Sequence, residues 1–218
     1  MATNLNQQLQ TPGTPDVGSA PSVYDRGYVD QSSGVLRTYF TRLNNIISTL
    51  LSPRGGKYLN TPYGAFQDST NQTAANTTTA YAITYDTTDF SNGVTLSNSS
   101  RLNVSQDGIY NIQFSIQFKN TSNDGHDMDV WFRKNGTNID KSNSRFHIPA
   151  RKSAGDPSHL IAALNFFVDL SATDYVEIMW RTSNTAVSIE FFGTSSSPTR
   201  PAVPSVITTL SFVSNRSA

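Results

Sequence analysis

Three aspartates, Asp124, Asp127 and Asp129, lie close together in the middle of the chain. Carboxylate oxygens in a loop that enters a strand can hold calcium. Neither a glutamate clamp nor the spacing of an EF-hand accompanies them, and the alternative is a solvated loop whose aspartates point to water. The sequence therefore predicts no bound metal, with these three residues as the candidate ligands if one binds.

The residue types that enzymes use are sparse or unsuitably spaced. The chain has no cysteine, which excludes a thiol nucleophile, a disulfide scaffold and a cysteine-ligated zinc site. His126, His147 and His159 have no metal-ligand spacing, and no phosphate-loop, dinucleotide or esterase motif occurs. The only glutamates, Glu177 and Glu190, fall in separate predicted strands. We expect no enzymatic activity and no cofactor.

Composition and charge restrict the partners. The 218 residues suffice for one core of about 150 residues with an appendage. Basic and acidic residues both number 16, and a net charge of zero argues against nucleic acid. No apolar run approaches the roughly 20 residues of a membrane helix, and the first ten residues lack a signal-peptide pattern. We expect a soluble, mostly β protein that acts by shape and contact and binds no membrane.

The N-terminal quarter differs from the rest of the chain. Residues 1–31 are rich in proline, glycine and small polar residues without apolar periodicity, which predicts an extended arm that needs a surface to lie on. Residues 32–52 then predict one amphipathic helix, with Ser32 or Ser33 as its cap. Residues 53–62, which begin with proline and contain two glycines, predict a linker.

The apolar residues of this helix recur at alternating spacings of three and four: Leu36, Tyr39, Leu43, Ile46 and Leu50. Such a seam is typical of a helix that packs on copies of itself. Because it spans only about two heptads, an amphipathic helix packed on its own domain or docked on a neighbouring protein is the alternative.

From about residue 58 the apolar period becomes two, as in residues 110–118, and we expect an all-β domain over residues 63–218. Short strands separated by turn signals are typical of a sandwich or barrel. Phe166 and Phe167 are adjacent, as are Phe191 and Phe192, so one ring of each pair should point outward. Such rings can be buried between subunits or covered by the arm or a loop.

Three motifs occur in the order typical of C1q/TNF-like jelly rolls. Residues 108–114 read GIYNIQF, residues 130–136 read VWFRKNG and residues 174–178 read DYVEI. These segments resemble successive strand motifs of that family, and the resemblance covers residues 63–213, about two-thirds of the chain.

Three further segments resemble C1q-like proteins of tailed bacteriophages more closely. They are residues 62–66 (PYGAF), 150–157 (ARKSAGDP) and 197–206 (SPTRPAVPSV). The resemblance implies a C1q/TNF-like jelly-roll β-sandwich that forms a homotrimer and is a virion part rather than an enzyme. By family position it implies four aromatic residues near the trimer axis: Tyr110, Phe166, Tyr175 and Phe192.

The resulting functional hypothesis is a structural protein of a tailed-phage virion. An arm and helix precede the jelly roll where mammalian relatives carry collagen or a signal anchor, which favours a particle component. We expect a trimeric capsid decoration or cement protein, bound to the major capsid protein or another virion protein through residues 1–52. The alternative is a tail-associated fibre or adhesin that binds host surface glycans, with Tyr63, Trp131 and Trp180 as candidate sugar-stacking residues against a role in the core.

Overall fold

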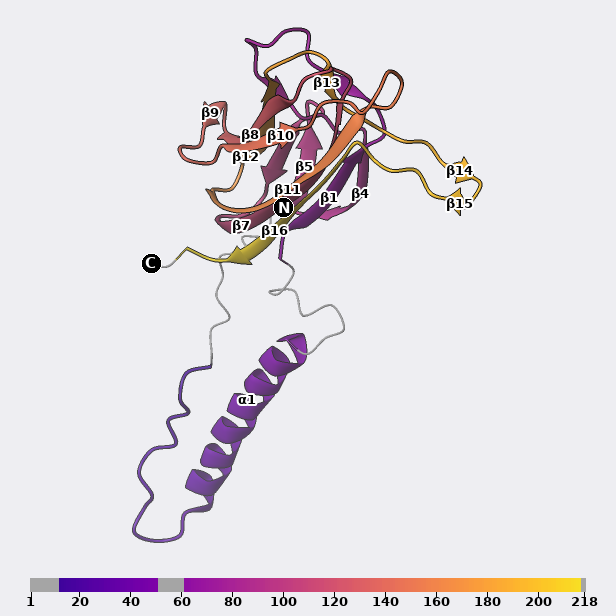
Figure 1. The fold of residues 1–218 in the computed structure, drawn as a ribbon. Coiled ribbons are helices and arrows are strands. Elements are labelled where there is room, and N and C mark those ends of the chain that lie inside the picture. Colours follow the sequence, from indigo (N-terminus) through magenta and orange to yellow (C-terminus); the bar gives the residue numbers. More distant parts are fainter. Residues whose placement is uncertain (1–11, 51–60, 217–218) are drawn as a thin grey trace. The chain divides into compact units, whose positions relative to one another are not determined.

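A computed structural model describes residues 12–50 and 61–216 of the chain (Figure 1). The chain divides into two compact units, residues 1–61 and 62–218. The first unit contains helix α1, and the second contains all the strands. The second unit's first strand starts at Tyr63, where the sequence predicts the β domain to begin.

Helix α1 spans Arg26–Leu50 and therefore begins six residues earlier than predicted. Asp25 caps it, because its carboxylate Oδ1 accepts the backbone N–H groups of Gly27 at 2.8 Å and Tyr28 at 3.4 Å. The predicted cap at Ser32 or Ser33 is wrong, and the predicted arm of residues 1–31 includes the first six residues of the helix. Residues 51–52 and nearly all of the predicted linker lie outside the described residues.

The end of the arm runs along α1. The Tyr28 hydroxyl donates to the Gly18 carbonyl at 3.4 Å, and the Ser32 hydroxyl lies 3.5 Å from the Val17 carbonyl. Further along, Pro12 and Pro15 are half-buried and line one pocket together with helix residues, including Val35 and Tyr39. One stripe of the helix is thus covered by its own chain.

The second unit consists of two antiparallel sheets that form a sandwich (Figure 1). The first sheet contains β1 (Tyr63–Asp68), β2 (Gln72–Thr73), β4 (Thr87–Asn92), β7 (Gly108–Asn120), β11 (Ser158–Leu170), β13 (Val187–Ile189) and β16 (Val206–Ser214). The second sheet contains β3 (Tyr81–Ala82), β5 (Val94–Ser97), β6 (Arg101–Val104), β8 (His126–Lys134), β9 (Thr137–Asn138), β10 (Ser144–Ile148) and β12 (Tyr175–Thr182). A projecting hairpin is formed by β14 (Ser195–Ser196) and β15 (Thr199–Arg200).

The chain crosses repeatedly from one sheet to the other between its long strands, as in a jelly roll. The alternation predicted for residues 110–118 is present, because Tyr110, Ile112, Phe114, Ile116 and Phe118 are all buried in the core. The predicted all-β sandwich with one helix is confirmed for the described residues.

The chain enters and leaves the sandwich at the same end. The backbone N–H of Phe212, near the end of β16, donates to the carbonyl of Pro62 at 2.8 Å, so entry and exit lie side by side.

Asn135 and Gly136 make a two-residue turn between β8 and β9, with φ of 48° and 81°. Positive φ at both positions is typical of a type I′ turn, and it confirms the predicted hairpin.

Candidate functional surfaces

The outer face of the first sheet carries the exposed apolar side chains of the sandwich. Within residues 61–216, every exposed large apolar residue belongs to β1, β4, β11 or β16: Tyr63, Phe90, Ile161, Phe167, Ile207 and Val213. Ile161 and Phe167 are 62% and 58% exposed. We call this surface, together with the outward side chains of β7, the apolar face. These six residues lie on four strands of one sheet, so this face carries the exposed apolar side chains that another protein could cover.

Paired amides lie on β7 and β11 within the apolar face. Asn165 on β11 lies opposite Gln113 on β7 in register, and Phe167 lies opposite Asn111. The Asn111 amide donates to Asn165 Oδ1 at 2.5 Å, and the Gln113 amide donates to Asn111 Oδ1 at 2.8 Å. Asn111 thus uses both of its amide groups within the face, so a partner can cover this residue without leaving it unpaired.

A compensated charge cluster lies where β7, β11 and β13 pair. Glu190 accepts a hydrogen bond from the Lys119 ammonium, and its other oxygen lies 2.9 Å from His159 Nε2. The Phe192 ring packs on the His159 ring with 5.5 Å between centroids. This cluster gives the apolar face a polar rim, the pattern that protein interfaces show around an apolar centre.

The four predicted axis residues do not gather at one surface. Tyr110 is fully buried and donates its hydroxyl to the Gln106 carbonyl at 2.8 Å. Burial raises the pKa of Tyr110 to about 12. Its predicted position at a trimer axis is wrong, since its own chain encloses the ring. Tyr175 belongs to the second sheet, where the Arg101 guanidinium lies 4.5 Å from its ring centroid.

Phe166 is turned toward the core, and Phe192 is half-buried at the rim. The Phe166 ring stacks on Phe132, with 4.8 Å between centroids. Because successive strand side chains point to opposite sides, its neighbour Phe167 is exposed instead. The prediction of one outward ring in this pair is confirmed, but the ring that faces outward is Phe167.

The outer face of the second sheet carries buried carboxylates that are paired with arginines. Asp129 accepts hydrogen bonds from Arg145 at 2.9 Å and from Arg181 at 2.8 Å. Although burial alone would raise its pKa, these bonds and charges hold the pKa of Asp129 below its ordinary value. Glu177 is likewise buried and lies 2.8 Å from Arg133. We call this surface the ion-paired face.

The three candidate metal ligands do not converge. Asp129 is occupied by its two arginines, and Asp127 Oδ1 lies 2.8 Å from His147 Nδ1. Asp124 is exposed in the loop before β8, where its backbone carbonyl accepts the Asn120 amide. No group of three metal-ligating side chains occurs among the described residues. The candidacy of Asp129 is wrong because both of its carboxylate oxygens already accept hydrogen bonds from guanidinium groups.

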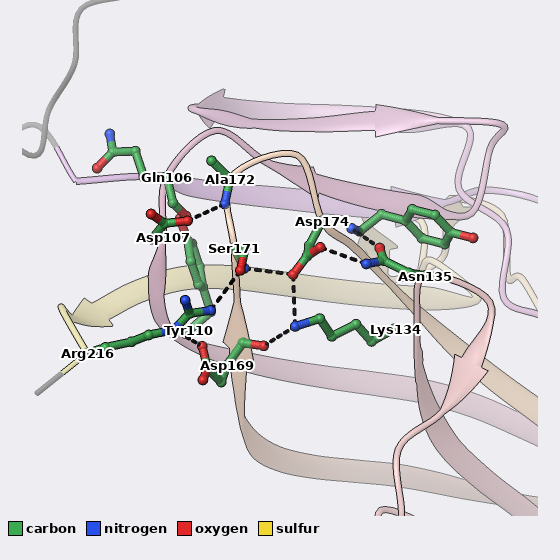
Figure 2. Close-up of polar contacts among 11 residues, drawn as sticks. Gln106, Asp107, Tyr110, Lys134, Asn135, Asp169, Ser171, Ala172, Asp174 and Arg216 are labelled. Atoms are coloured by element: carbon green, nitrogen blue, oxygen red, sulfur yellow. Dashed lines mark hydrogen bonds and ion pairs between the residues drawn. The ribbon is translucent and has the colours of Figure 1, made fainter. Parts of the chain in front are cut away.

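A polar network fastens the turns at the entry end of the sandwich, as Figure 2 shows. Asp174 accepts the Lys134 ammonium at 2.8 Å and the Asn135 amide at 2.6 Å, together with the Ser171 N–H. Burial alone would raise the pKa of Asp174, but these donors lower it by more, so the pKa lies below the ordinary value. Arg216 joins the network through Asp169. The Lys-Asn-Gly and Asp-Tyr motifs of the sequence therefore hold two turns together, which is a structural role.

Helix α1 has a second apolar stripe that the described part of the arm, from residue 12 on, does not cover. Val29, Leu36, Phe40 and Ile47 are exposed, at spacings of seven, four and seven. Of the predicted seam, Tyr39, Leu43 and Ile46 are half-buried and Leu36 is exposed, while the side chain of Leu50 lies outside the described residues. The seam is therefore divided between a stripe covered by the arm and an exposed stripe.

No known protein-family model matches this chain, and no curated protein matches it. Within residues 12–50 and 61–216, no helix is long and apolar enough to cross a membrane.

Proposed function

We propose that this protein is a structural component of a tailed-phage virion, a homotrimer that decorates the capsid. The observation that carries the proposal is the apolar face, where exposed Ile161, Phe167 and Ile207 surround amides that bond to one another. Burying apolar side chains is worth about 25 cal/mol per Å², so contact between copies of this face is favourable.

The resemblance to C1q/TNF-like jelly rolls supports a trimer as the assembly. Closed, symmetric homo-oligomers bury the same face of every subunit, whereas an open arrangement would leave the face exposed at its ends. The ion-paired face, with buried Asp129 and Glu177 already neutralised, is suited to solvent instead.

The exposed stripe of α1 supports association at a second place. The spacing of Val29, Leu36, Phe40 and Ile47 keeps these residues on one side of a supercoiled helix. Three such helices would form a short stalk, and the remaining part of residues 1–52 would anchor it to the major capsid protein or another virion protein. Three arms on one trimer bind with higher avidity than one.

The light-scattering mass of the full chain tests the trimer. We expect about three times the single-chain mass of 23.8 kDa. Phe167→Asp should reduce the mass toward 23.8 kDa, because a buried unpaired carboxylate opposes association. The matched control is Thr95→Asp on β5, an exposed position of the second sheet, which should leave the mass unchanged. A monomeric wild-type chain, or equal masses for all three, would contradict the proposal.

Quantitative mass spectrometry of purified particles tests the capsid position. A decoration protein is expected in hundreds of copies for each particle, whereas the alternative, a tail-associated fibre or adhesin, is expected in few. Absence of the chain from particles would overturn both virion roles.

A further inference from the structure

A pocket of about 410 Å³ opens on the ion-paired face, between β8, β9 and the loop of residues 139–143. This volume falls in the range of small-ligand sites, about 300–1,000 Å³. Trp131 lines it, whereas the other tryptophan, Trp180, is buried in the core. The remaining lining is mainly polar and includes Asn138, Asp140 and Asn143.

The indole of Trp131 is held in a fixed orientation. Its Nε1–H donates to Asn138 Oδ1 at 2.8 Å, and its half-buried ring borders the pocket. Because the one polar atom of the side chain is already bonded, the ring offers an apolar surface to a ligand. An aromatic ring locked in this way loses little conformational entropy on binding.

The opposite wall of the pocket is also fixed to the sheet. Buried Ser142 donates its hydroxyl to the Ile139 carbonyl at 2.7 Å and accepts the Phe132 N–H at 3.1 Å. The Ile139 N–H in turn donates to the Phe132 carbonyl at 2.9 Å. The loop that carries Asp140 and Asn143 is therefore anchored to β8, and the site is preformed.

The charges that line the pocket balance. Asp129 and Asp140 are matched by Lys141 and Arg181. Arg181 uses its Nε–H for Asp129, and its guanidinium has five N–H donors in all. Arg145 also pairs with Asp129 from outside the lining. Together the amide, carboxylate and guanidinium groups offer both donors and acceptors, which suits a ligand with many hydroxyls.

We propose that this pocket binds a neutral hexose unit of a carbohydrate. The apolar C–H face of the sugar ring would stack on Trp131, and its hydroxyls would bond to Asn138, Asp140, Asn143 and Arg181. The inference goes beyond the proposed decoration role and does not depend on where the chain lies in a particle. A trimer would present three such pockets, so weak single sites would combine on a polysaccharide.

Saturation-transfer NMR on the full chain tests the pocket. The probes are glucose, galactose, mannose and N-acetylglucosamine, with glucose 6-phosphate as the anionic comparison. We expect transfer to the ring protons of at least one neutral sugar, with a dissociation constant on the order of 1 mM. Trp131→Leu should weaken binding by about tenfold or more, since the stacking surface is lost.

Asn143→Ala keeps the test valid if Trp131→Leu fails to fold, because Asn143 is exposed and lies outside the core. It should also weaken binding, whereas Tyr63→Leu, an exposed aromatic position on the apolar face, should not. Absence of transfer from every neutral sugar, transfer unaffected by both pocket variants, or tighter binding of glucose 6-phosphate than of glucose would overturn the proposal. The oligomeric mass is measured separately, so these failures are distinct from failure of the trimer.

Discussion

The outer face of the first sheet presents Ile161, Phe167 and Ile207 to the surface, whereas that of the second sheet holds Asp129 and Glu177 under arginines. Both faces are built on strands with the same alternation, and both cover the same core. The two differ in how their outward groups are satisfied. On the ion-paired face the charges find partners within the chain, whereas on the apolar face Ile161, Phe167 and Ile207 remain exposed.

This difference indicates how one sandwich can divide its tasks. A face whose polar groups are paired with one another and whose apolar groups are exposed gains free energy when a protein covers it. A face made of ion pairs gains little from such burial, because desolvation offsets the attraction between the charges. The ion-paired face therefore remains available for solvent and, in our proposal, for a sugar.

The largest loss of folding stability should come from removing the Asp129 carboxylate. Asp129→Ala removes the shared acceptor of Arg145 and Arg181, and we expect unfolding to become easier by about 2 kcal/mol. Ile161→Ala on the apolar face is the matched comparison and should change monomer stability by less than about 0.5 kcal/mol. Urea denaturation at low protein concentration measures both. Equal changes for the two variants would remove the distinction between the faces.

Acid should reduce the folding stability that the ion-paired carboxylates of Asp129 and Asp174 provide. The pKa values of Asp129 and Asp174 lie below their ordinary values in the folded chain. Their contribution is therefore complete above about pH 4, where unfolded aspartates are ionised, and it disappears as the pH falls through the lower folded pKa values. We expect a flat melting temperature from about pH 7 to 5 and a decline below about pH 4. Asp129→Asn should show a shallower decline, and an identical pH profile would contradict the assignment.

The smallest effect should follow from the network at the entry end. Lys134 is partly exposed and donates to Asp174 and to the Asp169 carbonyl, each at 2.8 Å. Lys134→Met keeps the aliphatic stem and removes the charge, and we expect a loss of about 0.5–1 kcal/mol by thermal denaturation. Arg26→Met, which removes an exposed ion pair in α1, is the control and should leave the melting of the sandwich unchanged.

Local sequence patterns predict the strands and the hairpin turn because those features depend on neighbouring residues. Alternation over residues 110–118 and the Asn135–Gly136 turn are examples. Local patterns do not predict which of Phe166 and Phe167 points outward. Both residues are apolar, and a shift of one position in the strand register exchanges their sides. The helix start is hidden because Gly27 and Gly34 weaken the helical pattern.

The sites depend on contacts between distant parts of the chain. Asp129 receives Arg145 from β10 and Arg181 from β12, so a local cluster of aspartates gives a misleading indication of a metal site. The pocket beside Trp131 requires the loop that Ser142 anchors to β8. Alternation in residues 128–133 and 175–181 places Trp131 on the outward side and Trp180 on the inward side, but no spacing in the sequence indicates that Trp131 borders a pocket.

Thiol labelling reports whether the apolar face is buried between copies, because the chain contains no cysteine of its own. Ala163 on the apolar face and Thr95 on the second sheet are both exposed within the single chain. Single variants Ala163→Cys and Thr95→Cys would be labelled with a maleimide at high and low protein concentration. We predict that Ala163→Cys is protected at high concentration and becomes reactive on dilution, while Thr95→Cys reacts rapidly throughout. Equal and rapid labelling of both variants at high concentration would contradict burial of the apolar face between copies.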